Sequence, residues 1–392
     1  MFEFLKRLFG RTPAAAAPPP EPRLPFEEPH PLEAINPTFE AAVGARPEDA
    51  TAWQVYSDWL IDQGESWGEV IAAAQQGKPD TARQAAAERG LLGGMPAKVS
   101  WRGGVIEHFE LHDSFDAFEK KLLMHVVLER VLKHPAGHFV RKLTLGLPCA
   151  DSTEWHLEDL FKAISNAGPL PCLVELDLSQ GAEHMDQPSW RRVGDARVLW
   201  KAAPNLKVLA LQGAVGSDGG VPSMLAPIDA PHLEHLRFES GGLDRSVPLE
   251  LGAASLPSLT HLELWFGQAN YGANADVADL AGILDGAGLP ALKTLGLKNS
   301  EWEGELIEAV AKSKLLPRLE VVDFSMGVLA TESAAALLLH AARYQHLKRV
   351  DLSDNYFSAA DQQALKQALP NVHLGEQKAD EDPEYRYTSV GE

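Results

Sequence analysis

The chain has 392 residues, 45% of them apolar, which is enough for two or three domains with a large core. Its net charge of −20 and pI near 5.1 exclude the basic stripe of a nucleic-acid-binding protein, so we expect no nucleic-acid partner. Only Cys149 and Cys172 occur, without metal-type spacing, which favours a reducing, cytoplasmic compartment. No apolar run reaches the roughly 18 residues of a transmembrane helix.

The first eleven residues, MFEFLKRLFGR, have an amphipathic pattern. On a helical wheel one face carries the charged residues and the other collects Met1, Phe2, Phe4, Leu5, Leu8 and Phe9. This pattern favours a short docking helix, for a protein or for the inner face of a membrane. The alternative is an unstructured start, because so short a helix is marginal in water. Residues 12–31 are a Pro/Ala linker, and we expect residues 1–31 to be largely disordered.

Residues 32–95 are predicted to form a small helical module. The stretch from 39 to 77 contains a Y-x-D-W-L element followed by G-E, with matching positions at Pro47, Asp49, Val55, Tyr56, Asp58, Trp59, Leu60, Gly64, Gly68, Glu69 and Ile71. It resembles the bacterial repeat-companion domain, in which such a module precedes leucine-rich or similar repeats. The resemblance implies no chemistry. We interpret Asp58 and Glu69 as helix caps or bridges around packed aromatic residues rather than as a catalytic pair.

Residues 96–138 are predicted to cap the exposed end of the repeats that follow. A polar helix over 78–94 ends at a Gly-Gly pair, and a strand pair over 99–113 and an amphipathic helix over 115–135 come next. Two histidine pairs, His108/His112 and His134/His138, have the spacing that binds metal on a helix. The first pair lies in a strand-like stretch and the second spans a proline and a glycine, so we interpret all four as surface or capping residues.

Residues 139–374 repeat one phrase, a proline followed by L-x-x-L-x-L. The last apolar residue of each copy falls at 145, 178, 211, 238, 264, 297, 324 and 352. Residues two apart point to the same side of a strand, and units this small must stack to bury an apolar face. The pattern resembles the leucine-rich repeat family, and Asn355 stands where the family places an asparagine. The chain is therefore identified as resembling a bacterial leucine-rich repeat protein with an N-terminal repeat-companion domain.

The expected fold class is α/β: a horseshoe-shaped solenoid with a parallel concave sheet and a mostly helical convex side, preceded by the small module. Helical spacing is present in the connections 159–167, 276–287, 304–314, 332–344 and 358–369. The connections 212–230 and 239–256 are rich in Gly, Ser and Pro, which predicts irregular or single-turn structure. Residues 375–392 are predicted to be an acidic, disordered tail.

Residues that flank the strand leucines are expected to face the concave surface. Their charges are mixed, which suits a protein partner better than a phosphate backbone. The expected partner-binding residues are His235, Arg237, Glu239, His261, Glu263, Trp265, Lys298 and Asp323. Trp and Arg near the centre of such a surface are typical of interface hot spots. We expect a non-enzymatic, monomeric scaffold, with a peripheral membrane adaptor as the alternative.

A metal-dependent enzyme is the alternative from a different class. His235 and His261 occupy equivalent positions on neighbouring predicted strands, about 4.8 Å apart, and Glu263 lies two residues further on the same face. Two histidines and a carboxylate can hold zinc or iron. The sequence contains no P-loop, G-x-G-x-x-G or G-x-S-x-G, and GAVGSDGG at 213–220 lacks the lysine of a phosphate cradle. We therefore expect no catalysis and no cofactor.

Overall fold

The computed structural model describes residues 34–112, 123–146, 157–180, 191–214, 225–380, 382 and 385–391. The predicted docking helix over 1–11 and the linker over 12–31 lie outside these residues. Within them, no helix is long and apolar enough to cross a membrane.

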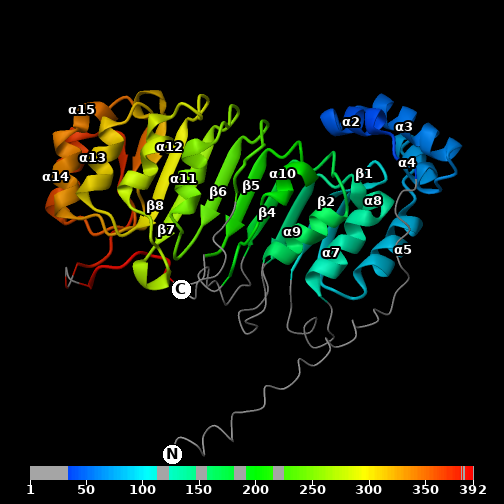
Figure 1. Ribbon diagram of the computed structural model, residues 1–392, viewed down its shortest axis with the longest axis horizontal. Helices are drawn as coiled ribbons and strands as arrows, with labels where there is room; N and C mark the ends of the chain where they lie inside the picture. The colour runs from blue at the N-terminus through cyan, green and yellow to red at the C-terminus, as the bar shows by residue number, and fades with distance from the viewer. Residues whose placement is uncertain are drawn as a thin grey trace, which may run out of the picture.

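A single eleven-stranded sheet runs the length of the molecule, with the strands in sequence order (Figure 1). The first two strands pair antiparallel, and all later neighbours are parallel. The strands are β1 (Ala97–Arg102), β2 (Val105–Leu111), β3 (Lys142–Gly146), β4 (Glu175–Gln180), β5 (Val208–Gln212), β6 (His235–Glu239), β7 (His261–Gly267), β8 (Thr294–Ser300), β9 (Val321–Asp323), β10 (Arg349–Asp351) and β11 (Val372–His373).

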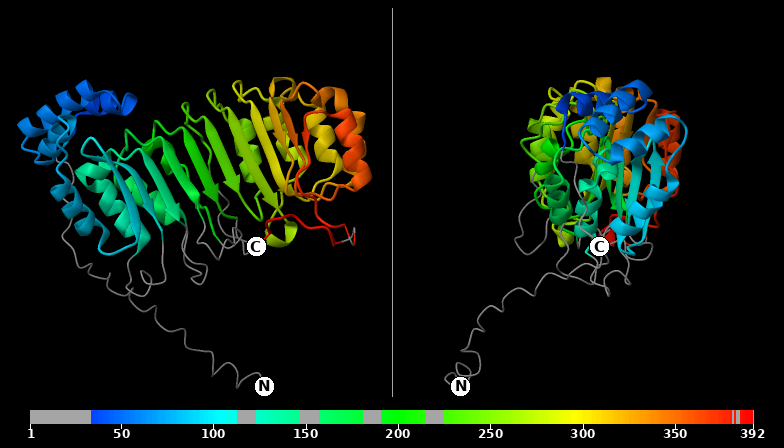
Figure 2. Two further views of the ribbon diagram at one scale, coloured as in Figure 1. Left: turned by 180° about the vertical axis from the view of Figure 1, so that it is seen from behind. Right: turned by 90° about the vertical axis from the view of Figure 1, so that its right-hand side faces the viewer.

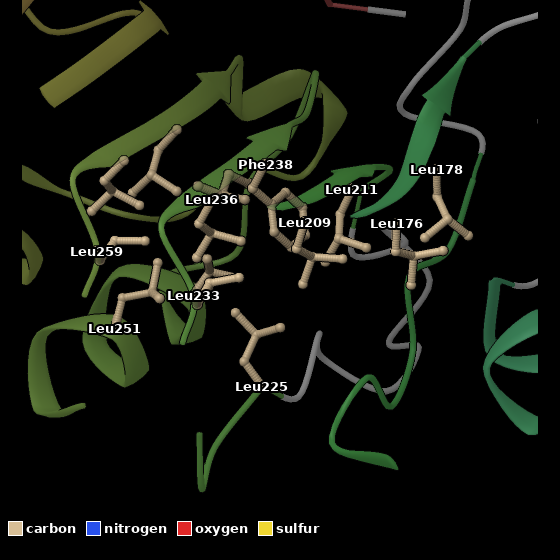
Figure 3. Packing of buried hydrophobic residues seen from close by; sticks show 14 of the residues in the cluster. Leu176, Leu178, Leu209, Leu211, Leu225, Leu233, Leu236, Phe238, Leu251 and Leu259 are labelled. Carbon is tan, nitrogen blue, oxygen red and sulfur yellow. The ribbon is translucent and has the colours of Figure 1, made fainter. Parts of the chain in front are cut away.

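The repeated leucines stack in register and form the core. Leu176, Leu209, Leu236 and Leu262 pair as Cα partners on successive strands, and each is at most 1% exposed. Figure 3 shows Leu176, Leu209 and Leu236 of the strands with Leu225, Leu233 and Leu251 of the connections in one continuous layer. One face of each of these strands therefore packs in the core, and the alternate residues point to the opposite face of the sheet.

The proline of the repeated phrase has a physical role in the turn before each strand. The first leucine of each phrase donates its backbone N–H to the carbonyl oxygen three residues earlier, at 3.1–3.3 Å in all seven copies from Leu173 to Leu347. Proline stands at the second position of six of these turns, and glutamine stands there in the seventh. Proline fixes φ near the value that this position of a β-turn requires. The phrase thus encodes turn and strand together.

Helices cover one face of the sheet and leave the other open (Figures 1 and 2). In chain order the connections contain α7 (Met124–Lys133), α8 (Pro135–His138), α9 (Leu157–Asn166), α10 (Val198–Ala202), α11 (Ser246–Ala253), η2 (Ala269–Tyr271), η3 (Val277–Leu280), α12 (Ala281–Asp285), α13 (Gly304–Lys312), η4 (Leu316–Arg318), α14 (Thr331–Leu339), α15 (Ala341–Tyr344) and α16 (Ala359–Ala368). We call the uncovered side the open face.

The helices predicted in the connections from 159 to 369 are present, with two differences in detail. Of the helix predicted over 115–135, residues 115–122 lie outside the described residues, and the remainder contains α7. The helix expected over 276–287 is a 3-10 turn followed by α12, and the one over 332–344 is divided at His340. The expectation for 239–256 was wrong, because α11 makes two full turns there. Pro248 lies in its first turn, where no intrahelical donor is lost, and Val247 and Leu251 are fully buried. Tertiary packing overrides a poor local propensity at this point.

The N-terminal module consists of α2 (Pro37–Ala45), α3 (Ala50–Asp62), α4 (Trp67–Gln75) and α5 (Thr81–Leu92). Asn36, Asp49 and Asp80 accept backbone N–H groups at the starts of α2, α3 and α5, as N-caps do. The helix predicted over 78–94 is confirmed, and it ends at Gly93 in the left-handed conformation. Glu69 pairs with Arg83 at 3.2 Å, in line with the bridging role expected for it.

The module packs directly on the sheet. Trp53 and Tyr56 make edge-to-face contacts with Phe139, at ring-centroid distances of 5.3 and 5.4 Å. The buried thiol of Cys172 belongs to the same cluster. Gly44 lies so close to the start of the β4 turn that a Cβ would come within 2.5 Å of the Pro171 carbonyl oxygen. Helices α2 to α4 therefore dock against the residues that lead into β3 and β4.

The predicted histidine roles are partly confirmed. His108 contacts the Thr144 hydroxyl at 2.9 Å and His112 contacts Glu110 at 2.6 Å, both at partly exposed positions. His134 caps α8 through Nδ1, which accepts from the Ala136 N–H, and burial lowers its pKa to about 4. His138 differs, because it is buried 3.4 Å from the Glu40 carboxylate.

The prediction of a disordered C-terminal segment was wrong for the residues of it that the structure describes. Its described residues, 375–380, 382 and 385–391, form backbone hydrogen bonds to Asn355, Met326 and Asn299. Thr388 is 2% exposed. Composition pointed to a solvated tail, but the contacts that hold the segment come from strand ends more than twenty residues away in the sequence.

Candidate functional site

The predicted binding residues lie on the open face because they alternate with the core leucines. In β6 and β7, Leu236, Phe238, Leu262 and Leu264 are buried in the core, so the residues between them face outward. Strand register sets the neighbours across the face. Arg237 is opposite Glu263 and Trp265 is opposite Lys298.

His235 and His261 are direct partners in the ladder and their rings stack. The ring centroids are 5.4 Å apart and the planes are 16° from parallel. Desolvation and the neighbouring His261 lower the pKa of His235. Stacked rings do not direct their nitrogens at one point. Among the described residues, no group of three or more His, Cys, Asp or Glu is placed to hold a metal ion, and the proposed zinc or iron set gains no support.

Glu263 is the centre of a polar cluster on β7 and β8. Its Oε1 accepts from Trp265 Nε1 at 2.6 Å and from Lys298 Nζ at 3.3 Å, and its Oε2 lies 3.6 Å from His261 Nε2. Gly296, opposite Glu263 in the ladder, leaves room for this arrangement, since a Cβ there would lie 3.0 Å from Glu263 Cγ. Burial disfavours the carboxylate, but the groups around it outweigh burial and lower its pKa to about 2.

Lys298 links this cluster to the next strand. Its ammonium lies 3.6 Å from Asp323 on β9 and 5.1 Å from the centre of the Trp265 ring. Burial raises the pKa of Asp323 in spite of Lys298 and of the hydrogen bonds from Ser325. The structure therefore brings His261, Glu263, Trp265, Lys298 and Asp323 together as one connected group. We call it the Glu263 cluster.

Arg237 and Glu239 belong to a second group that points toward β4 and β5. Arg237 Nε lies 2.9 Å from Glu239 Oε1, and Arg237 Nη2 donates to Ser179 Oγ at 2.7 Å. Glu239 also accepts from Gln212 at 3.0 Å, and Gln212 in turn accepts from Arg191. Although Arg237 pairs with Glu263 in the backbone ladder, its side chain turns to the opposite side. The eight predicted residues are thus divided between two neighbouring clusters.

Three residues of this second group, Ser179, Arg191 and Gln212, were not among the predicted site residues. For Ser179 a signal was present, because the triplet Asp-x-Ser recurs at 177–179, 323–325 and 351–353. In each copy the aspartate Oδ1 accepts the backbone N–H of the serine at 2.9–3.0 Å. Such a contact ends the strand and orients both side chains. Nothing in the sequence indicates that Arg191 reaches Gln212.

The open face presents partly exposed aromatic and cationic side chains next to buried charged pairs. The side chains of Glu263 and Lys298 form an ion pair with each other and are only 16% and 15% exposed. Trp265 is half-buried, Arg237 is 38% exposed, and His235 is exposed. The described part of the face presents an indole, a guanidinium and two imidazoles on a rigid base of paired charges. A rigid base lowers the entropic cost of binding.

These features define a mixed α/β protein with one eleven-stranded, mostly parallel sheet, an arrangement compatible with an α/β solenoid. The chain is similar to a crystal structure of a Bacteroides fragilis protein, a target of the Northeast Structural Genomics Consortium. The TM-score is 0.61 at 23% identity, over 80% of this chain and 86% of that one. This likeness concerns the fold alone. No family model matches the chain, and no curated protein matches it either.

Proposed function

We propose that this protein is a non-enzymatic scaffold of the leucine-rich repeat class that binds a protein partner through the open face of its sheet. The support for the class is the coincidence of the repeated phrase with turn, strand and core in seven consecutive units. In a horseshoe of that class the open face is the concave one. The N-terminal module then has the place of a companion domain, at one end of the repeats.

One observation carries the proposed binding role. Three neighbouring strands contribute to a face that no helix of the described residues covers (Figure 2), and His235, Arg237, His261, Trp265 and Lys298 lie on this face. Interface hot spots favour Trp and Arg in the middle of a contact area, surrounded by polar side chains. Truncating such an anchor typically costs about 2 kcal/mol or more of binding free energy.

The test compares full-length wild type with Arg237→Ala/Trp265→Ala in quantitative affinity capture from native lysate. Glu308→Ala/Lys312→Ala is the control, because that exposed ion pair lies on α13, on the covered side of the sheet. A protein retained by wild type and by the control but lost from the double variant supports the proposal. Equal retention by all three chains would contradict it.

A second candidate, a peripheral membrane adaptor, rests on the amphipathic pattern of residues 1–11. Phe2, Phe4, Leu5, Leu8 and Phe9 form its apolar side, and Lys6, Arg7 and Arg11 would face anionic headgroups. Deletion of residues 1–11 should abolish co-sedimentation with vesicles that contain anionic lipid. Phe4→Ser/Leu8→Ser should do the same with the charge kept, and co-sedimentation unchanged by either alteration would remove this candidate.

A further inference from the structure

An unusual backbone feature recurs where β8, β9 and β10 end. Asn299, Met326 and Asp354 have φ values of 54°, 70° and 56°, and they are the described non-glycine residues with positive φ. Each lies two positions after the last apolar residue of its repeat, so the three are equivalent. This conformation is unfavourable for a residue with a Cβ, although Asn and Asp tolerate it better than Met does. A strained conformation that recurs in three units points to a shared purpose.

All three residues bind the same stretch of chain, residues 387–391. The side-chain amide of Asn299 brackets Val390: its Oδ1 accepts the Val390 N–H at 2.9 Å and its Nδ2 donates to the Val390 carbonyl at 2.6 Å. The Met326 carbonyl accepts from the Ser389 backbone at 3.0 Å and from its hydroxyl at 3.2 Å. The Ser389 hydroxyl also lies against Asp354 Oδ2. The left-handed turns thus present acceptors and an amide to one extended segment.

A second pair of hydrogen bonds, to the N–H and the carbonyl of one residue, holds the segment at Tyr387. The Tyr356 hydroxyl accepts the Tyr387 N–H and donates to the Tyr387 carbonyl, both at 3.1 Å. Lys378 Nζ donates to the same carbonyl at 3.0 Å. Bonds to main-chain groups recognise any extended peptide, whatever its side chains.

The side chains at three positions give the site its selectivity. Thr388 is 2% exposed, which limits that position to a small residue, and Ser389 supplies a hydroxyl to Asp354. At Gly391 a Cβ would lie 2.6 Å from the Tyr271 ring, so any larger residue must displace that ring or the segment and glycine fits best. By contrast, Tyr385 is 75% exposed and contributes nothing to the fit.

We propose that this edge of the sheet, formed by Asn299, Met326, Asp354 and Tyr356, is a binding site for extended peptide segments of partner proteins. The ligand class is a segment with a small residue, then Ser or Thr, any residue, and Gly. Residues 387–391 occupy the site in cis and exclude such partners. A tethered occupant acts at an effective concentration of about millimolar, so a free peptide binds only when the segment is weakened.

The test uses full-length chains and a fluorescent synthetic peptide with the sequence of residues 384–392, followed by anisotropy. Gly391→Val evicts the internal segment through its clash with Tyr271 and should bind the peptide at least about tenfold more tightly than wild type does. Ser389→Asp, which places a second carboxylate beside Asp354, evicts it independently. Tyr385→Ala in the same segment is the control and should bind as weakly as wild type.

Two further measurements locate the site. Asn299→Asp, added to Gly391→Val, removes the amide that donates to the peptide carbonyl and should weaken peptide binding roughly tenfold. A peptide that carries Gly391→Val itself should not bind. If the Gly391→Val and Ser389→Asp chains bind no peptide, the edge only holds the chain's own C-terminal segment and the proposal fails. It also fails if adding Asn299→Asp to Gly391→Val leaves peptide binding unchanged.

The partner class is tested on a synthetic array of degenerate peptides probed with the Gly391→Val chain. Selection of a hydroxyl residue at the position of Ser389 and of glycine at that of Gly391 supports the proposal, and no selection overturns it. Dimers of the variant, measured by light scattering, would mean that a second copy fills the site, which also overturns it. None of these outcomes depends on the Arg237 and Trp265 surface.

Discussion

At the scale of single residues, Glu263 is the charged group on which the open face depends. Its carboxylate accepts from an indole and an ammonium and is only 16% exposed. The residue that organises the candidate binding surface is therefore not the residue that a partner would touch. The more exposed Arg237 and Trp265 are held in place by the less exposed carboxylates of Glu239 and Glu263.

Glu263→Gln tests this dependence through the pH profile of stability. The pKa of Glu263 is lowered from 4.5 to about 2, so the carboxylate stabilises the folded state above pH 4.5 and loses that effect as the pH falls toward about 2. Near neutral pH the variant should be less stable by roughly 2–3 kcal/mol, measured by urea unfolding. The difference should shrink below pH 4.5. A difference independent of pH would show that the charge is not responsible. Glu308→Gln, at an exposed position of α13, is the control.

Asn355 supports a second prediction at this scale. Its fully buried amide donates to the carbonyls of Phe324, Leu352 and Ser353 at 3.0–3.2 Å and accepts the Leu329 N–H at 3.0 Å. Asn355→Ala would leave these backbone groups unpaired and should lower the free energy of unfolding by roughly 3 kcal/mol. Asn166→Ala, at an exposed helix end, should change it by less than about 0.5 kcal/mol. Equal effects in chemical denaturation would refute this role for Asn355.

At the scale of elements, the contact between α2 and the turn before β4 controls the docking of the N-terminal module. Gly44→Ala would place a methyl group 2.5 Å from the Pro171 carbonyl oxygen. We expect the module to loosen, with faster backbone hydrogen exchange in α2 to α4. Gly90→Ala is a matched control within α5, where a Cβ meets nothing within 4 Å. That change should stabilise α5 by up to about 1 kcal/mol. Unchanged exchange in α2 to α4 of Gly44→Ala would contradict the assignment.

The elements that sequence predicts well are those whose signal is local. The turn, the strand and the inward leucines of each repeat lie within nine residues, and proline and leucine positions specify them. Helix α11 was missed because its stability comes from packing: Gly252 lies against Gly282 of α12 so closely that a Cβ would come within 2.9 Å of its Cα. The order of the C-terminal segment was missed for the same reason, since Asn299 and Tyr356 hold it from distant repeats.

The site was predictable to a similar degree. Alternation along β6 to β9 placed all eight predicted residues on one face, and this followed from strand geometry alone. The division into two clusters did not follow, because it depends on side-chain choices: Arg237 selects Glu239 and Ser179 over its ladder partner Glu263. Whether the open face binds a protein stays a prediction.

At the scale of the whole molecule, the C-terminal segment joins several successive repeats. It touches Tyr271 after β7, Asn299 near the end of β8, Met326 after β9 and Asp354 after β10. In a stack of repeats, stability is a sum of nearest-neighbour terms, and a segment that spans four units adds coupling between them. The second half of the molecule should therefore unfold more cooperatively than the first.

Weakening this connection should have a regional effect. With Gly391→Val, we expect hydrogen exchange to rise at the turns that follow β8, β9 and β10, because the segment no longer protects Asn299, Met326 and Asp354. Exchange in β3 to β6, which the segment does not touch, should stay as in wild type. A uniform rise along the chain, or none at all, would show that the segment does not couple the repeats.

The buried thiol of Cys172 can report the rate at which the N-terminal module opens. It is 1% exposed beneath Trp53 and Phe139, and burial raises its pKa to about 12, so it is inert to alkylating reagents while the module is docked. In a chain with Cys149→Ser it is the one remaining sulfhydryl. Its labelling rate then equals the rate at which α2 to α4 lift away from the sheet. Under reagent excess, a faster rate in Gly44→Ala than in Gly90→Ala would time that opening directly, without any partner in hand.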